Sequence, residues 1–119
     1  MGFQTIPILR SFDETKALEF YVDFLGMTVD WRHRFEENFP LYMQVSKDDL
    51  VFHLSEHSGD GTPGTKLLVH TNQLQSFFDE IKVKKYRYSK PEITTADWGA
   101  RIFAVTDPFS NTITFSEVE

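Results

Sequence analysis

Histidine is the side chain best suited to acid–base or metal chemistry in this sequence, because cysteine is absent. That absence excludes disulfides, thiolate catalysis and thiolate metal sites. His53 lies in an apolar run and is the best candidate for a general base. His57 follows it by four residues, which on a strand is too long a separation for a tight chelate. His33 lies in the polar run 32–34 and is expected to be solvated.

No other catalytic constellation is evident in the sequence. Gly59, Gly61 and Gly64 form a hinge without a following Lys-Ser/Thr pair, so they do not make a phosphate-binding loop. Glu36 and Glu37 are typical of a surface turn. The net charge of −6 with scattered lysines argues against a nucleic-acid partner. No segment approaches the length of a membrane span, and the lack of cysteine favours a cytoplasmic location.

The second half of the sequence repeats the plan of the first half at an offset of about sixty residues. In the first half, the apolar run 41–45 is followed by a polar turn and then by 52–56. In the second half, 101–105 is followed by a turn and then by 113–117, and both copies end in Ser-Glu. Two small units that cannot each bury an apolar face alone are expected to pair around a shared cavity.

The first half predicts a β-α-β-β-β unit. The apolar segment Phe3–Leu9 is interpreted as a strand, with Pro7 indicating an edge or irregular pairing. Apolar residues at helical spacing predict a helix over Thr15–Phe24, with Asp13 as its cap and Gly26 as its end. Three β-like runs follow: Met27–Phe35, Leu41–Val45 and Leu50–Ser55.

After the glycine-rich hinge the same plan begins again. A strand is predicted over Lys66–His70, and Asn72 is expected to cap a helix. The apolar face of this helix comprises Leu74, Phe77, Phe78 and Ile81. The remaining predictions are a strand over Tyr86–Ser89, a loop over Pro91–Gly99, and strands over Arg101–Val105 and Thr112–Ser116.

These elements predict an α+β fold with a single domain over residues 1–119. Two tandem β-α-β-β-β modules, about 3–57 and 65–118, flank the hinge 58–64 and pair their sheets around a central cavity.

Three short motifs resemble those of the vicinal oxygen chelate superfamily, which includes glyoxalase I, extradiol dioxygenases and bleomycin-resistance proteins. Asp13 is followed by Phe20-Tyr21 and then by Phe24-Leu25-Gly26-Met27, similar to the family's first-helix signature. The segment 107–111 is similar to its Asp-Pro turn, with Phe109 and Ser110 in place of an acidic residue and a glycine. The resemblance covers nearly the whole chain and implies the doubled fold.

The resemblance also implies four metal-ligand positions, two from each half. Here they are occupied by Ile6, His53, about Lys66, and Thr114. Of these residue types only histidine coordinates a divalent metal well. No metal or other cofactor is therefore expected, and a weak site of His53 with His70 and water is the alternative.

Members that lack the metal ligands are the bleomycin-resistance proteins, which dimerise and sequester the antibiotic in grooves between subunits. The resemblance to them places Trp98, before the Gly99 bend, at a groove mouth, where its face could stack on a ligand. Acidic residues near the expected openings, Glu56, Asp60 and Asp97, would suit a cationic guest. Strand alternation adds further candidate ligand-binding residues: His53, Thr114, Phe103, Lys66 and Tyr42 inside the pocket, with Trp31 and Phe39 at its rim.

The sequence therefore predicts a homodimeric protein that binds a small molecule without transforming it, by analogy with bleomycin resistance and antibiotic binding. One alternative is a metal-dependent enzyme of the same superfamily, a lyase or an oxidoreductase, with an atypical metal site. Another is a sensor or carrier with a different ligand.

Overall fold

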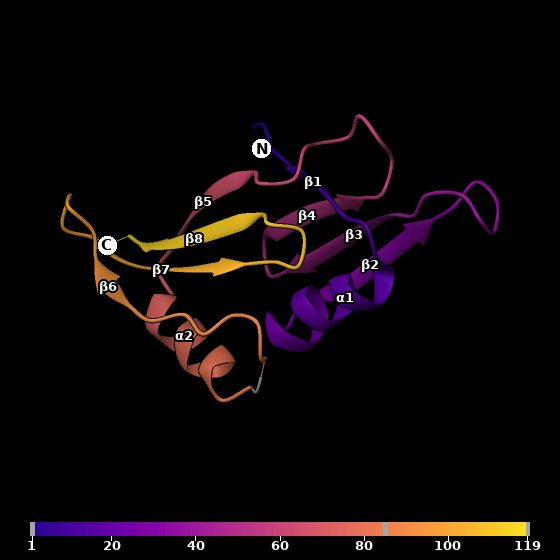
Figure 1. Cartoon of the computed structure of the whole chain (residues 1–119). Helices are drawn as coiled ribbons and strands as arrows, with labels where there is room; N and C mark the ends of the chain where they lie inside the picture. Colours follow the sequence, from indigo (N-terminus) through magenta and orange to yellow (C-terminus); the bar gives the residue numbers. More distant parts are fainter. Residues whose placement is uncertain (1, 85, 119) are drawn as a thin grey trace. The chain divides into compact units, whose positions relative to one another are not determined.

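The computed structural model describes residues 2–84 and 86–118. It divides the chain into two compact units, Met1–Pro63 (unit 1) and Gly64–Glu119 (unit 2). Each unit contains one four-stranded sheet, with the strand orders β1-β4-β3-β2 and β5-β8-β7-β6 (Figure 1). In each sheet the first strand pairs in parallel with the last, and the other pairings are antiparallel. The repeat in the sequence is thus a repeat of topology, and the predicted α+β fold class is confirmed.

Unit 1 comprises one helical segment and four strands, and the predicted hinge 58–64, called here the linker, follows them. Its helical segment is α1 (Glu14–Leu18) continued by the π-helical η1 (Glu19–Phe24). Its strands are β1 (Ile8–Arg10), β2 (Thr28–His33), β3 (Tyr42–Lys47) and β4 (Leu50–Ser55). The first strand is shorter than predicted: pairing begins only after Pro7, and Phe3 is fully exposed.

Local chemistry defines both ends of the first helix as predicted. The Asp13 side chain accepts a hydrogen bond from the Lys16 N–H at 2.9 Å, which is a standard N-cap. At the other end Gly26 has a φ of 78°, and the N–H groups of Gly26 and Met27 donate to the carbonyls of Val22 and Tyr21. These two bonds, each one residue wider than in a Schellman motif because the helix ends as a π-helix, surround a left-handed residue, a conformation that favours glycine.

Unit 2 follows the same order with different helix ends. It comprises β5 (Lys66–Thr71), α2 (Leu74–Lys82), β6 (Thr94–Thr95), β7 (Arg101–Thr106) and β8 (Thr112–Glu117). The prediction that Asn72 caps α2 is wrong: Gln73 is the N-cap residue, and its side chain makes no capping bond. Instead the Thr71 hydroxyl oxygen accepts a hydrogen bond from the Gln73 N–H, so the last residue of β5 stabilises the turn before the helix.

The predicted strand over Tyr86–Ser89 is also wrong. Residues 87–88 form a turn, and the fourth strand of the sheet is Thr94–Thr95, inside the segment predicted to be a loop. The Tyr86 and Tyr88 rings contact each other edge to face at 5.7 Å, and Tyr88 is mostly exposed. These aromatic residues pack locally rather than on the pleated surface of a sheet, so β propensity misled the prediction.

In each unit a helix covers one face of the sheet and creates the core there. In unit 1, Tyr21 contacts Phe52 edge to face at 6.1 Å, and both are buried. In unit 2, Phe77 of α2 contacts Phe103 and Phe115. The side chains that alternate with these core residues lie on the opposite face, which no helix of the described part of the same unit covers. We refer to this second face as the open face of each unit.

The linker contains one glycine that the fold requires. Gly61 has a φ of 69°, and a Cβ there would lie 2.8 Å from the Ile8 carbonyl oxygen and 3.3 Å from the Arg10 nitrogen. The linker backbone therefore packs against β1 on the side away from β4. This covers the edge strand of the first sheet.

Candidate functional site

The candidate site is a group of five side chains on the open face of unit 1: Asp30, Trp31, Tyr42, Gln44 and His53, called here the open-face network. The strand register brings them together, because Gln44 of β3 lies between His53 of β4 and Trp31 of β2. All five belong to three adjacent strands of one sheet. The network is therefore held by backbone hydrogen bonds rather than by loops.

A β-bulge determines which side chain of β2 reaches the network. The register with β3 shifts between Val29 and Trp31, so that Val29 pairs with Val45 while Trp31 pairs with Gln44. Without the extra residue, alternation would turn Trp31 toward the helix-covered face. The same shift turns Arg32 toward α1, where it forms an ion pair with Glu14 that Arg34 shares. The bulge thus places an aromatic ring on the open face and two cations on the helix side.

Four of the five side chains form a continuous chain of hydrogen bonds. Tyr42 Oη lies 2.7 Å from His53 Nδ1, His53 Nε2 lies 2.9 Å from Gln44 Oε1, and Gln44 Nε2 lies 3.0 Å from Asp30 Oδ2. Because the carboxylate accepts, the Gln44 amide nitrogen donates to Asp30 and its oxygen accepts from His53. His53 is therefore protonated at Nε2, and in the neutral imidazole its Nδ1 accepts from the Tyr42 hydroxyl.

The ionisation of the two ends of this chain agrees with these donor and acceptor roles. Hydrogen bonds from Gln44 and then Ser46 lower the pKa of the Asp30 carboxyl, which keeps it an acceptor at neutral pH. Burial, with a smaller contribution from the Asp60 charge, raises the pKa of the Tyr42 phenol above its ordinary value. Tyr42 therefore remains a protonated donor at neutral pH.

Aromatic contacts hold the exposed edge of the network. The Trp31 ring stacks on Tyr42 with centroids 5.9 Å apart and an interplanar angle of 6°. The His53 ring meets both at about a right angle, with centroids 5.2 Å from each. Trp31 is 42% exposed, so part of its ring remains available to a flat ligand group.

Metal binding does not fit these residues. Both ring nitrogens of His53 already bond to side chains, and a metal would have to displace Tyr42 or Gln44. Within residues 2–84 and 86–118, no group of three or more His, Asp or Glu side chains is arranged to hold a metal ion. Ile6, Lys66 and Thr114 at the other family positions supply no suitable donor set. The same hydrogen bonds keep Nδ1 of His53 from acting as a free general base.

The other candidate residues of unit 1 lie outside the open-face network. Phe39 is 44% exposed in the loop between β2 and β3, where its ring contacts Phe35 at 5.5 Å. His57 follows β4 with its ring 6.3 Å from Tyr42, and His33 is exposed at the end of β2.

In unit 2 the structure corrects the predicted position of Phe103. Its side chain is 1% exposed and packs on Phe77, Phe78 and Phe115 beneath α2. Thr114 lies on the open face instead, next to Ala104 in the register. The two residues occupy opposite faces of one sheet, so Phe103 belongs to the core rather than to the expected pocket. Strand alternation alone does not indicate which face of the sheet the helix covers.

Lys66 and Trp98 are both exposed residues of unit 2. Lys66 begins β5. Trp98 is 68% exposed beside a cavity of about 310 Å³ lined also by Gly99, Ala100, Arg101 and Glu117. Arg101 donates two hydrogen bonds to the Glu117 carboxylate and a third to Gln75. Trp98 therefore stands next to a bidentate ion pair.

The comparisons with known proteins agree with this architecture. A family model described as "Glyoxalase superfamily protein" matches residues 1–119. The chain belongs to this superfamily. A comparison with curated protein sequences found no match.

Several solved structures share the fold. A bleomycin-binding protein complexed with bleomycin has a TM-score of 0.77 and 19% identity, with 99% of this chain and 100% of the other covered. A bleomycin resistance determinant encoded on transposon Tn5 has a TM-score of 0.75 and 18% identity, with 99% of each chain covered. The bleomycin-binding protein of Streptomyces verticillus, complexed with copper(II)-bleomycin, has a TM-score of 0.74 and 22% identity, with 100% and 98% covered. At these identities the likeness establishes the fold.

No helix in the described part of the chain is long and apolar enough to cross a membrane.

Proposed function

We propose that this protein binds a small molecule without transforming it, as proteins of the bleomycin-resistance type do. The ligand would be a bleomycin-like antibiotic or a similar natural product, sequestered in a groove of a homodimer. The proposal is supported by superfamily membership and by similarity in fold to proteins described as bleomycin-binding or as a bleomycin resistance determinant. It includes a cytoplasmic location, because the sequence has no cysteine.

The observation that supports binding most directly is the form of the open-face network. A half-exposed tryptophan lies parallel to a tyrosine, and the hydrogen bonds from Tyr42 through His53 and Gln44 to Asp30 hold that tyrosine in place. Such an arrangement is preorganised, so stacking a flat ligand group on Trp31 orders few additional side chains. A catalytic site would instead require a nucleophile, base or metal position open to substrate, and the His53 nitrogens are already bonded.

Fluorescence titration tests the proposal. Metal-free and copper-loaded bleomycin are added separately to the protein while tryptophan emission is followed. We expect saturable quenching near one drug molecule per subunit. Sedimentation measurements of the same samples would check the proposed dimer.

Single substitutions then identify the surfaces involved. Trp31→Ala and Trp98→Ala should each weaken binding about three- to tenfold, because each removes one stacking face. Tyr88→Ala is a matched control, since Tyr88 is as exposed as Trp98 but was not predicted to contact a ligand. No quenching by micromolar drug would rule out bleomycin as the ligand. Stoichiometric bound metal lost on His53→Ala would instead favour the metal-dependent enzyme.

A further inference from the structure

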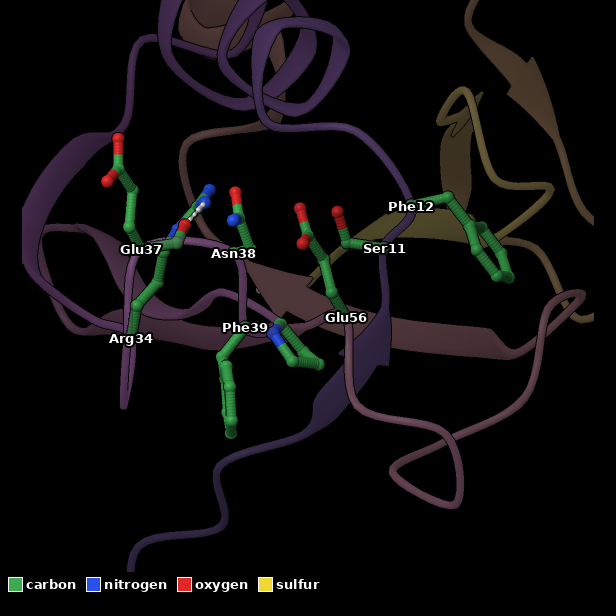
Figure 2. Close-up of a pocket in the computed structure, with 8 residues that line it drawn as sticks. Ser11, Phe12, Arg34, Glu37, Asn38, Phe39 and Glu56 are labelled. Atoms are coloured by element: carbon green, nitrogen blue, oxygen red, sulfur yellow. Dashed lines mark hydrogen bonds between the residues drawn. The ribbon is translucent and has the colours of Figure 1, made fainter.

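Unit 1 contains a cavity of about 390 Å³, whose lining shares no residue with the open-face network. It lies where the chain leaves β1, beside the loop between β2 and β3 and the first residue after β4 (Figure 2). Its lining is formed by Ser11, Phe12, Arg34, Glu37, Asn38, Phe39, Pro40 and Glu56. The residues come from three segments of one compact unit, so the fold of unit 1 alone assembles this pocket.

Backbone pairing fixes the position of Glu56 in the pocket. Its N–H donates to the Leu41 carbonyl at 2.9 Å, and the Leu41 N–H donates in return to Glu56 Oε1 at 3.1 Å. One carboxylate oxygen is therefore engaged. The other, Oε2, accepts no hydrogen bond from the described residues. The carboxylate is thus held in place with one oxygen left for another donor.

Ser11 is a buried polar residue whose hydroxyl is directed toward the same space. The residue is 2% exposed, and its backbone N–H donates to the Ser55 carbonyl at 2.8 Å. Within residues 2–84 and 86–118 its hydroxyl makes no hydrogen bond. Figure 2 shows the Ser11 hydroxyl, the Glu56 carboxylate and the Asn38 amide pointing in the same direction. The hydroxyl is thus available in the pocket to a ligand or to solvent.

The two arginines around the pocket are already bonded to protein acceptors. Arg34 donates to the Glu14 carboxylate at 3.2 Å and to the Glu37 carbonyl at 3.3 Å. Arg10 donates to the Glu56 carbonyl at 3.3 Å, and its guanidinium lies over the Phe12 ring, 4.6 Å from the centroid. Each guanidinium keeps further N–H groups, but the free Glu56 carboxylate oxygen, the Ser11 hydroxyl and the Asn38 amide provide several acceptors that point in the same direction. Such a set of acceptors suits a ligand with several donors.

We propose that this pocket binds a small nitrogen cation with several N–H groups, a primary ammonium or a guanidinium. Glu56 supplies the opposite charge and one acceptor oxygen, and Ser11 and Asn38 supply further acceptors. The Phe39 ring bounds the pocket on its exposed side and can contact the cation or its alkyl chain. The site uses none of the open-face residues, and shares with the predicted antibiotic groove only Phe39 and Glu56.

Chemical-shift titration of the amide NMR spectrum tests this site without any antibiotic. The probes are n-butylammonium and methylguanidinium, added at constant pH and ionic strength. We expect saturable shifts at the amides of Ser11, Asn38 and Glu56. Tetramethylammonium has the same charge but no N–H donor, so it should bind at least tenfold more weakly. Equal binding of all three cations, shifts scattered over the surface, or saturation of these amides by acetate would each overturn the proposal.

Two variants test the assigned residues. Glu56→Gln keeps a carbonyl oxygen for the Leu41 N–H but removes the charge, and should weaken probe binding about tenfold or more. Ser11→Ala should weaken it about threefold, with little change in the rest of the spectrum. Glu92→Gln removes an equal charge from an exposed residue of unit 2 and should leave binding unchanged. Unchanged binding by Glu56→Gln would exclude this pocket as the cation site.

Discussion

The open faces of the two units occupy equivalent positions in the same topology but have different chemistry. When the β3–β4 and β7–β8 hairpins are compared by their registers, His53 is equivalent to Thr114, Gln44 to Ala104 and Tyr42 to Ile102. In unit 1 these positions form a hydrogen-bonded aromatic network. In unit 2 they are short or apolar, and Leu68 beside them is 58% exposed. The helix-covered faces, by contrast, are apolar in both units.

This difference shows which positions of the repeat are free to change. Side chains under the helices must fill space at high density, so both copies keep them apolar. Side chains on the open face have no such constraint within their own unit. The open faces of the two units therefore differ while the topology is the same, and the candidate site is asymmetric although the scaffold repeats.

The largest predicted effect tests the assignment of Phe103 to the core. Phe103→Ala should lower the free energy of unfolding by about 3–5 kcal/mol, because it removes a ring packed against Phe77, Phe78 and Phe115. Thr114→Ala, on the opposite face of the same sheet, should cost less than about 1 kcal/mol. Urea unfolding of both variants measures the two values. Similar losses for both would contradict the division of unit 2 into a core face and an open face.

The turns before the last strand of each unit should also differ in how much a substitution destabilises the protein. Asp107 is 4% exposed and accepts the N–H groups of Phe109 and Asn111, each at 2.8 Å, as well as the Asn111 side chain at 2.9 Å. Asp107→Ala should cost about 2–4 kcal/mol, because these buried donors lose their acceptor. In unit 1 the corresponding hairpin turn contains exposed Asp49, and Asp49→Ala should change stability by less than about 0.5 kcal/mol. Thermal unfolding compares the pair, and equal shifts in Tm would refute the distinction.

A smaller effect of opposite sign is expected at Ser110. Its φ of 70° lies in the left-handed region, where a residue with a Cβ is strained. Ser110→Gly should raise the free energy of unfolding by about 0.5–1 kcal/mol, the strain relief exceeding the entropic cost of glycine. Asp48 has a φ of 53° in the unit 1 turn, but aspartate tolerates this region better, so Asp48→Gly should gain less. Chemical denaturation distinguishes the two, and a destabilised Ser110→Gly variant would contradict the expectation.

The smallest predicted effects are pH-dependent changes in stability, which occur at alkaline pH in unit 1 and at acidic pH in unit 2. The pKa of Tyr42 is raised from 10.0, first by burial and then by the Asp60 charge. Its contribution to stability is therefore complete below pH 10 and is lost as the pH rises through the folded-state pKa. Tyr42→Phe should reduce the alkaline slope of stability relative to the unsubstituted protein. An unchanged slope between about pH 9 and 11 would count against the burial of this phenol.

In unit 2 the corresponding change in stability occurs at acidic pH. The hydrogen bond from Arg101 lowers the pKa of the Glu117 carboxyl from 4.5. Its contribution is present above that pH and is lost as the pH falls through the folded-state pKa. Arg101→Gln should flatten the dependence of stability on pH between about 3 and 5. Because the pair is accessible to solvent, added salt should reduce the effect in the unsubstituted protein.

The sequence alone determined the features that depend on local chemistry. Asp13 and Gly26 predicted the two ends of the first helix, because a cap and a left-handed residue act within one turn of the chain. Strand alternation within β3 and β4 is likewise local, and Tyr42 and His53 do share the open face of unit 1. The family motifs add the Asp107 turn, whose hydrogen bonds from Phe109 and Asn111 lie within five residues.

Only the tertiary structure decided which face and which neighbours those residues meet. The bulge at residues 29–31 turned Trp31 to the open face, and such a register shift depends on pairing with β3. Phe103 proved to be a core residue because α2 packs on its side of the sheet. The pocket containing Ser11, Asn38 and Glu56 joins three segments distant in the sequence. Contacts of this kind depend on the packing of distant elements, and no local pattern in the chain encodes them.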